Sequence, residues 1–139
     1  MIDTNVLSEL MRDAPDPSVL AWFSEQTANL LHTSAVTQAE ILAGIALLPA
    51  GKRRDAMANA ASQMFEKDFS GRCHEFGKFA VPHYALVRAQ RQRMGRPIDI
   101  ADAQVAAIAL ATGFVLVTRN TKDFEDIDDL QLINPWQSH

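Results

Sequence analysis

The sequence has little cysteine, glycine and proline, and it has no long run of apolar residues. Of its 139 residues, one is cysteine and six each are glycine and proline, while 47% are hydrophobic and 22% are charged. This balance excludes disordered, collagen-like and low-complexity chains and is typical of a folded domain with one buried core. The single Cys73 excludes an internal disulfide and a CxxC metal motif.

Signals for membrane insertion and export are also absent from the sequence. The uncharged run Ile41 to Gly51 contains Gly44 and Pro49, and no run in the chain reaches the about 20 apolar residues that a bilayer requires. The N-terminus lacks a basic stretch followed by an apolar one, so we expect no secretory signal. We therefore expect a cytoplasmic protein without membrane contact.

Several common motifs for nucleotide binding and catalysis are missing. The sequence has no GxxxxGK followed by Ser or Thr and no GxGxxG, which argues against P-loop and Rossmann sites. Its four histidines lack metal-ligand spacing, so a zinc site or a histidine-based nuclease is disfavoured. Ser34 and Cys73 show no strand-turn-helix elbow, which disfavours a nucleophilic hydrolase. The net charge of -4 also argues against a general DNA-coating protein.

Predicted strands alternate with predicted helices along the chain. Apolar runs predict a first strand that ends near Asp3, followed by strands over 30–34, 72–76, 114–118 and 130–133. Helical spacing, caps and stop signals predict helices over 18–25, 37–48, 52–69, 81–94 and 101–111. This alternation predicts an α/β fold with a mostly parallel sheet. Because no linker or repeat divides the chain, we interpret residues 1–139 as a single domain.

Four acidic residues lie after predicted strands or open the helices that follow them: Asp3, Glu40, Asp102 and Asp123. Parallel α/β sheets bind ligands at the carboxyl ends of their strands, so we expect these side chains to converge. Two carboxylates about 5 Å apart repel by roughly 3 kcal/mol at an effective dielectric constant of 20. A protein tolerates such a cluster only with a bound cation or with raised pKa values. Oxygen ligands without a His or Cys cluster indicate Mg²⁺ or Mn²⁺ rather than Zn²⁺.

Each of these acids also has a purely structural interpretation. Asp3 can cap the following helix, and Glu40 is the third residue of a capping box. Asp102, like Asp99 just before it, can interact with the macrodipole of a helix. Asp123 opens an acidic run that is typical of a solvated loop. No single acid decides between these interpretations, and the prediction of a site depends on their shared location.

Basic side chains gather on two of the predicted helices. Arg88, Arg91 and Arg93 lie near the end of the helix predicted over 81–94, and a second basic group opens the helix over 52–69. The three arginines are candidate contacts for RNA phosphates. A basic patch that only increases solubility is the alternative interpretation.

Four motifs of this chain resemble those of the PIN-domain family in order and in spacing. They are Ile2-Asp3-Thr4-Asn5-Val6-Leu7-Ser8-Glu9, Ser34-Ala35-Val36-Thr37-Gln38-Ala39-Glu40-Ile41, Asp102-Ala103-Gln104-Val105-Ala106-Ala107, and Val117-Thr118-Arg119-Asn120 with Asp123-Phe124. With the ending Asn134-Pro135-Trp136, the chain is similar to the VapC and FitB-like toxins of toxin-antitoxin pairs. The resemblance covers nearly the whole chain.

The resemblance implies a compact three-layer α/β/α sandwich, usually dimeric, that cleaves RNA with Mg²⁺ or Mn²⁺. It also implies a cognate antitoxin that covers the site and supplies the DNA-binding part of a regulatory complex. Nothing in this chain resembles a DNA-reading helix-turn-helix or ribbon, in agreement with that division of labour.

The resemblance further implies roles for individual acidic and polar residues. The metal ion would be held by three acids, Asp3, Glu40 and Asp102, with Asp123 as a further catalytic candidate. Carboxylates or water would be oriented by the polar residues Asn5, Thr118 and Asn120. Many relatives carry aspartate at the position of Asn120, whose amide cannot supply that charge but can still form hydrogen bonds.

We therefore predict a Mg²⁺-dependent endoribonuclease that is the toxin of a toxin-antitoxin pair and cleaves RNA with a metal-activated water. The expected products carry a 5′-phosphate and a 3′-hydroxyl. One alternative is a weakly active or inactive PIN-like binding subunit that works through its antitoxin in a DNA-binding complex. Another is a Mg²⁺-dependent phosphatase of small substrates. Only two residues precede Asp3, so either the first strand is unusually short or the natural start lies upstream.

Overall fold

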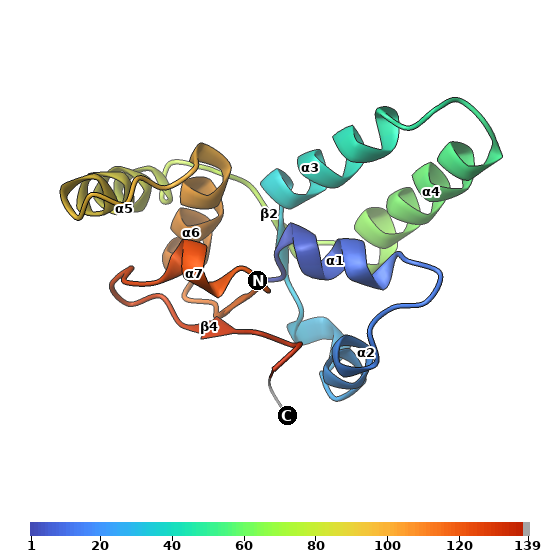
Figure 1. The fold of residues 1–139 in the computed structure, drawn as a ribbon, viewed down its shortest axis with the longest axis horizontal. Coiled ribbons are helices and arrows are strands. Elements are labelled where there is room, and N and C mark those ends of the chain that lie inside the picture. The colour runs from blue at the N-terminus through green and yellow to red at the C-terminus, as the bar shows by residue number, and fades with distance from the viewer. Residues whose placement is uncertain (138–139) are drawn as a thin grey trace.

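The computed structural model describes residues 1–137 and places helices on both sides of short parallel strands (Figure 1). The elements in chain order are α1 (Thr4–Leu10), α2 (Pro17–Ser24), the 3₁₀ turn η1 (Ala28–Leu30), β1 (Thr33–Ser34), α3 (Ala35–Ala46), α4 (Lys52–Gln63), the π-helical η2 (Met64–Asp68), β2 (Cys73–His74), α5 (Val81–Arg93), α6 (Ile100–Thr112), β3 (Leu116–Val117), α7 (Thr121–Phe124) and β4 (Leu132–Ile133). Within the described residues, no helix combines the length and the apolar character that crossing a membrane requires.

Two pairs of parallel strands are joined through the first residues of the chain. β1 pairs with β2, with Ser34 opposite His74, and β3 pairs with β4, with Val117 opposite Ile133. Between the pairs, Ile2 forms a parallel bridge to Val117, and the Ile2 N–H donates to a carbonyl just before β1 at 2.7 Å. The predicted α/β fold with a mostly parallel central sheet is confirmed.

Neighbouring side chains of this central layer face two separate hydrophobic cores. Leu116 packs with residues of α5, α6 and α7, whereas Val117 packs with residues of α1 to α4. Successive side chains of a strand point to opposite faces, so each face receives its own layer of helices. The helices of the two groups lie on opposite sides of the strands in Figure 1, and the predicted three-layer α/β/α arrangement is confirmed.

Several elements lie where the sequence predicts them. Asp16 caps α2 by accepting the Ser18 N–H at 2.8 Å, and Pro82 lies in the first turn of α5. α6 ends at Gly113, whose φ of 75° favours glycine. These three helices match the predicted ranges to within one residue. The strands predicted over 72–76, 114–118 and 130–133 are also present, each with two paired residues.

Three elements in the first half of the chain differ from the prediction. The strand expected over 30–34 is reduced to β1, because the residues before it form the turn η1. The helix expected from Thr37 begins two residues earlier, because Ser34 Oγ accepts the Thr37 N–H at 3.0 Å and caps it. The interpretation of Glu40 as part of a capping box is therefore wrong. The helix expected over 52–69 changes from α to π hydrogen bonding at Met64.

Candidate active site

Asp3 lies where the chain leaves the central layer and α1 begins, and it is only 4% exposed. Its Oδ1 accepts the Thr4 N–H at 2.8 Å, so Asp3 caps α1. Its Oδ2 accepts hydrogen bonds from the Thr118 hydroxyl at 2.9 Å and from the Asn5 amide at 3.2 Å. The carboxylate thus caps α1 and connects this helix to the residue that follows β3.

Asn5 and Thr118 connect this carboxylate to the chain that follows β3. The Asn5 amide donates to Thr118 Oγ1 at 3.1 Å, and Asn5 Oδ1 accepts the Arg119 N–H at 2.9 Å. Thr118 Oγ1 also accepts the Asn120 N–H at 3.1 Å. Asn5 and Thr118 therefore lie beside the carboxylate, as the resemblance implies, whereas Asn120 reaches the network through its backbone.

Glu40 approaches the same region from α3, where its side chain is exposed. Its Oε1 accepts a hydrogen bond from the Thr4 hydroxyl at 2.6 Å. Thr4 Oγ1 also lies 3.3 Å from Thr37 Oγ1, so this hydroxyl connects α1 to α3. Thr4 was not among the site residues predicted from the sequence, although its place directly after Asp3 in the first motif is a signal that could have identified it.

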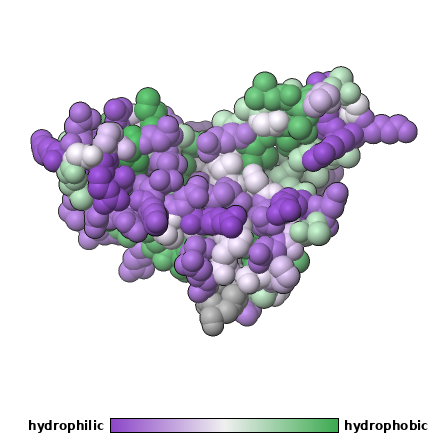
Figure 2. Space-filling model, in the orientation of Figure 1, coloured by the Kyte–Doolittle hydropathy of each residue, from purple (hydrophilic) through white to green (hydrophobic). Residues whose placement is uncertain are grey.

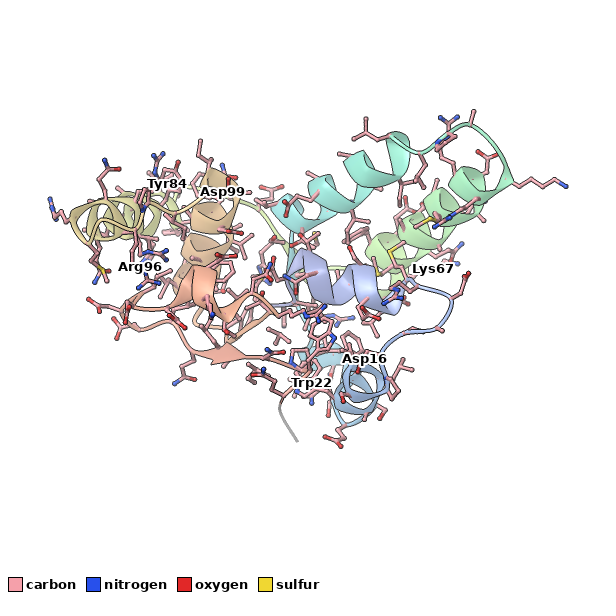
Figure 3. All side chains as sticks on the ribbon, in the orientation of Figure 1. Asp16, Trp22, Lys67, Tyr84, Arg96 and Asp99 are labelled. Carbon is pink, nitrogen blue, oxygen red and sulfur yellow. The ribbon has the colours of Figure 1, made fainter. Side chains whose placement is uncertain are left out.

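Asp102 faces the other acids from the first turn of α6 and is half-buried. Burial, followed by the negative charges of Asp3, Asp123, Asp99 and Glu40, raises the pKa of Asp102 to about 7. Asp99 caps α6 at its N-terminal end, where Figure 3 labels it. Acids from separate segments of the chain therefore raise the pKa of one carboxyl group. Asp99 is one of them, in addition to the four acids that were predicted as site residues from the sequence.

The pKa of Asp3 is raised as well, chiefly because its carboxylate is buried. The hydrogen bonds from the Thr4 N–H and the Thr118 hydroxyl oppose this effect, while the charge of Glu40 adds to it. Burial and neighbouring negative charge therefore raise the pKa values of both carboxyl groups, and the charge of Asp3 is one cause of the rise at Asp102.

The comparison with protein families matches residues 1–130 to the PIN domain. The chain belongs to the PIN-domain family. Together, the four acids and the polar network around Asp3 lie on the four motifs that carried the resemblance.

This PIN domain is similar to named proteins over nearly its whole length. It is 42% identical to the VapC ribonuclease Y4jK of Sinorhizobium fredii, over 99% of this chain and 97% of the relative. It is 33% identical to toxin FitB of Neisseria gonorrhoeae, over 98% of this chain and 97% of the relative. A solved structure of FitAB bound to the IR36 DNA fragment matches it with a TM-score of 0.91 at 33% identity, over 98% of this chain and 94% of the other. The predicted relationship to VapC and FitB toxins is confirmed.

The three arginines proposed as RNA contacts do not share one surface of this PIN domain. Arg91 is 5% exposed and donates to two backbone carbonyls, so its prediction as a phosphate contact is wrong. Arg88 and Arg93 are exposed, and Arg88 Nη1 donates to the Tyr84 hydroxyl at 3.0 Å. The burial of Arg91 could have been predicted from helical spacing, because Arg91 follows the apolar Val87 by four residues and so lies on the same buried face of α5.

The acids of this PIN domain offer only oxygen atoms as ligands. No ion pair within residues 1–137 involves Asp3, Glu40, Asp99, Asp102 or Asp123, so no side chain there balances their charge through a salt bridge. In that same part of the chain, no three His, Cys, Asp or Glu side chains are grouped closely enough to hold a metal ion. By charge and by donor type the residues fit a hard divalent cation such as Mg²⁺, and holding it requires the carboxylates to draw together.

Proposed function

We propose that this PIN domain is a Mg²⁺- or Mn²⁺-dependent endoribonuclease that is the toxin of a toxin-antitoxin pair. The observation that carries the proposal is the pKa of Asp102, raised to about 7 by burial and by four acids that no salt bridge balances. A cation would remove the repulsion between these carboxylates and so favour their drawing together around it. The names of the similar VapC ribonuclease and toxin FitB support the substrate class and the biological role.

Asp3, Glu40 and Asp102 would hold the metal ion in this proposal. The bound ion would neutralise charge on the scissile phosphate and lower the pKa of the attacking water. Asp3 is oriented by its three hydrogen bonds, and Glu40 by the Thr4 hydroxyl, so both are positioned by the protein itself. Asp102 releases its proton near neutral pH, and the exposed Asp123 remains the candidate fourth acid. The products would carry a 5′-phosphate and a 3′-hydroxyl.

A hollow in the surface gives RNA a place to lie against these acids. Figure 2 shows the outline hollowed between the group of α5 and α6 and the group of α3 and α4. The N-terminal ends of α3 and α6 border this hollow in Figure 1. Arg88 and Arg93 remain candidate contacts for phosphates, and we add the exposed Arg119. The Arg119 guanidinium lies 4.8 Å from the centre of the Trp136 ring, and its backbone N–H donates to Asn5.

A protein partner is the second part of the proposal. Leu42 on α3 is 41% exposed and Leu47 at its end is 86% exposed, and Figure 2 shows hydrophobic surface over α3 and α4. The similar structure of FitAB bound to a DNA fragment supports a protein partner in a complex on DNA. In this proposal the partner is a cognate antitoxin, and the chain reaches DNA only through it. A homodimer and a cytoplasmic location complete the proposal.

The test is to incubate the purified protein, freed of any copurified partner, with total cellular RNA in Mg²⁺ or Mn²⁺. Controls contain EDTA or the Asp102→Asn variant, which keeps the size of the side chain and removes its charge. Discrete fragments that require the metal ion and are absent with the variant would support the nuclease. A folded protein that binds metal and cleaves no RNA would refute it and favour the inactive binding subunit.

A further inference from the structure

Arg91 is a buried cation on α5 whose donors reach two other segments of the chain. It is only 5% exposed. Its Nη1 donates to the Asp123 carbonyl at 2.8 Å, and its Nε donates to the Arg96 carbonyl at 2.9 Å. The Arg91 carbonyl in turn accepts the Arg96 N–H at 2.9 Å. One side chain therefore connects α5 to α7 and to the turn that follows α5.

Both connected segments carry acids of the candidate site. The carbonyl bonded by Nη1 belongs to Asp123 itself, and the segment that begins at Arg96 leads directly to Asp99 and into α6, which carries Asp102. α7 has four residues, so its few backbone hydrogen bonds cannot hold it in place without tertiary contacts. The position of Asp123 therefore depends on what holds α7.

Arg96 adds a second connection to the same segment. Its Nη1 donates to Asp126 Oδ2 at 2.6 Å, and its Nη2 donates to the Lys122 carbonyl at 3.3 Å. Figure 3 shows Arg96 on the side of α7 that faces α5. Arg96 is partly exposed and solvent screens its pairs with the acids, whereas the hydrogen bonds of Arg91 are shielded from water. Arg91 is thus the more rigid of the two connections.

We infer that Arg91 is a positioning residue that fixes Asp123 relative to Asp99 and Asp102 through its hydrogen bonds to the backbone. The inference rests on the proposed function, since these acids matter only if they hold a metal ion or act on a substrate. Both hydrogen bonds end on carbonyl oxygens rather than carboxylates, so the geometry of the donors is what matters. The planar guanidinium directs Nε and Nη1 along fixed directions, and a lysine ammonium cannot reproduce this fork.

The test uses Arg91→Lys, which keeps the charge, and Arg91→Met, which keeps the apolar stem. The exposed Gln92, next to Arg91 on the same helix and without a role in the proposed site, supplies the control variants Gln92→Lys and Gln92→Met. Amide hydrogen exchange of the metal-free protein reports on residues 121–126 and 96–102, and calorimetry measures Mn²⁺ binding. We expect faster exchange in these two segments alone, Mn²⁺ affinity about tenfold weaker and kcat about 100-fold lower for both Arg91 variants.

Three outcomes would overturn the inference. Unchanged exchange and Mn²⁺ affinity would show that Arg91 holds neither segment. Full recovery with Arg91→Lys would show that charge rather than the direction of the donors is required. Faster exchange throughout the chain with normal Mn²⁺ affinity would show a purely structural role. If both Arg91 variants give the expected exchange and Mn²⁺ results but the parent protein cleaves no RNA, the positioning role stands and the proposed function fails.

Discussion

Replacing Asp102 with asparagine should stabilise the metal-free protein, and the gain should depend on pH. The pKa of Asp102 is about 7 in the folded protein and about 3.8 when the chain is unfolded. Between these values the folded state binds more protons than the unfolded state, so the free energy of unfolding falls as pH rises. The charge-dependent penalty is absent below about pH 4, grows up to about pH 7 and is constant above it. Asparagine has no charge and escapes this penalty.

The size of the effect follows from the burial of this side chain. A rise in pKa from 3.8 to about 7 would correspond to about 4 kcal/mol for a carboxyl group shielded from water. Asp102 is half-exposed, and solvent screening of its repulsion reduces the expected gain to about 1–2 kcal/mol. For a chain of this length, the gain corresponds to a rise in Tm of about 3–8 °C at about pH 8.

The assay is thermal unfolding of the parent and of Asp102→Asn in EDTA, from about pH 4 to about pH 8. The difference in Tm between the two proteins cancels the titration of every other group that the substitution leaves unchanged. Excess MgCl₂ should then raise the Tm of the parent far more than that of the variant. A Tm difference that does not change with pH, or a variant less stable at about pH 8, would refute the reasoning about Asp102.

Three further predictions concern the network, metal binding and the histidines. Thr118→Val removes the hydroxyl that donates to Asp3 and should lower kcat about 10–100-fold. The same variant should lower the free energy of unfolding by only about 1 kcal/mol. Thr118→Ser, which keeps the hydroxyl, should remain active. Protonation of Asp102 should weaken Mg²⁺ binding about tenfold per pH unit below about pH 7, and calorimetry showing an affinity independent of pH would contradict its role. The rings of His32 and His74 are in contact, with Nδ1 of His32 2.8 Å from Nε2 of His74, and burial lowers the pKa values of both. The stability that the neutral pair contributes is therefore complete above pH 6.5 and is lost as pH falls. His74→Gln should reduce this loss in acid unfolding, and an equal loss in both proteins would exclude the pair as its cause.

The convergence of the acids could be predicted because it depends on a general property of parallel sheets. Asp3 follows the first strand segment, and Asp102 and Asp123 begin the helices around β3. Parallel strands carry their following residues to one edge, whatever the details of the packing. The charges that act on Asp102 come from these segments. The sequence therefore located the acidic cluster without any knowledge of distances.

The contacts between particular side chains could not be predicted, because they depend on tertiary geometry. Both Ser34 and Thr37 are good helix caps, and the local sequence does not choose between them. Pairing of β1 with β2 extends to Ser34, so the helix begins directly after it and Ser34 becomes the cap. This start leaves Glu40 free of a capping role and within reach of the Thr4 hydroxyl. His32 and His74, 42 residues apart, meet through the same strand pairing.

Asp3 shows that a cap and a functional role are not alternatives for one carboxylate. Capping uses Oδ1 alone, because a single oxygen satisfies the Thr4 N–H at the start of α1. Oδ2 remains for the Thr118 hydroxyl and the Asn5 amide, which come from the end of β3 and from α1 itself. Capping also fixes the side chain at the carboxyl edge of the sheet, where ligands bind. A capping signal in the sequence therefore does not count against a place in the site, since here the cap is what orients the carboxylate.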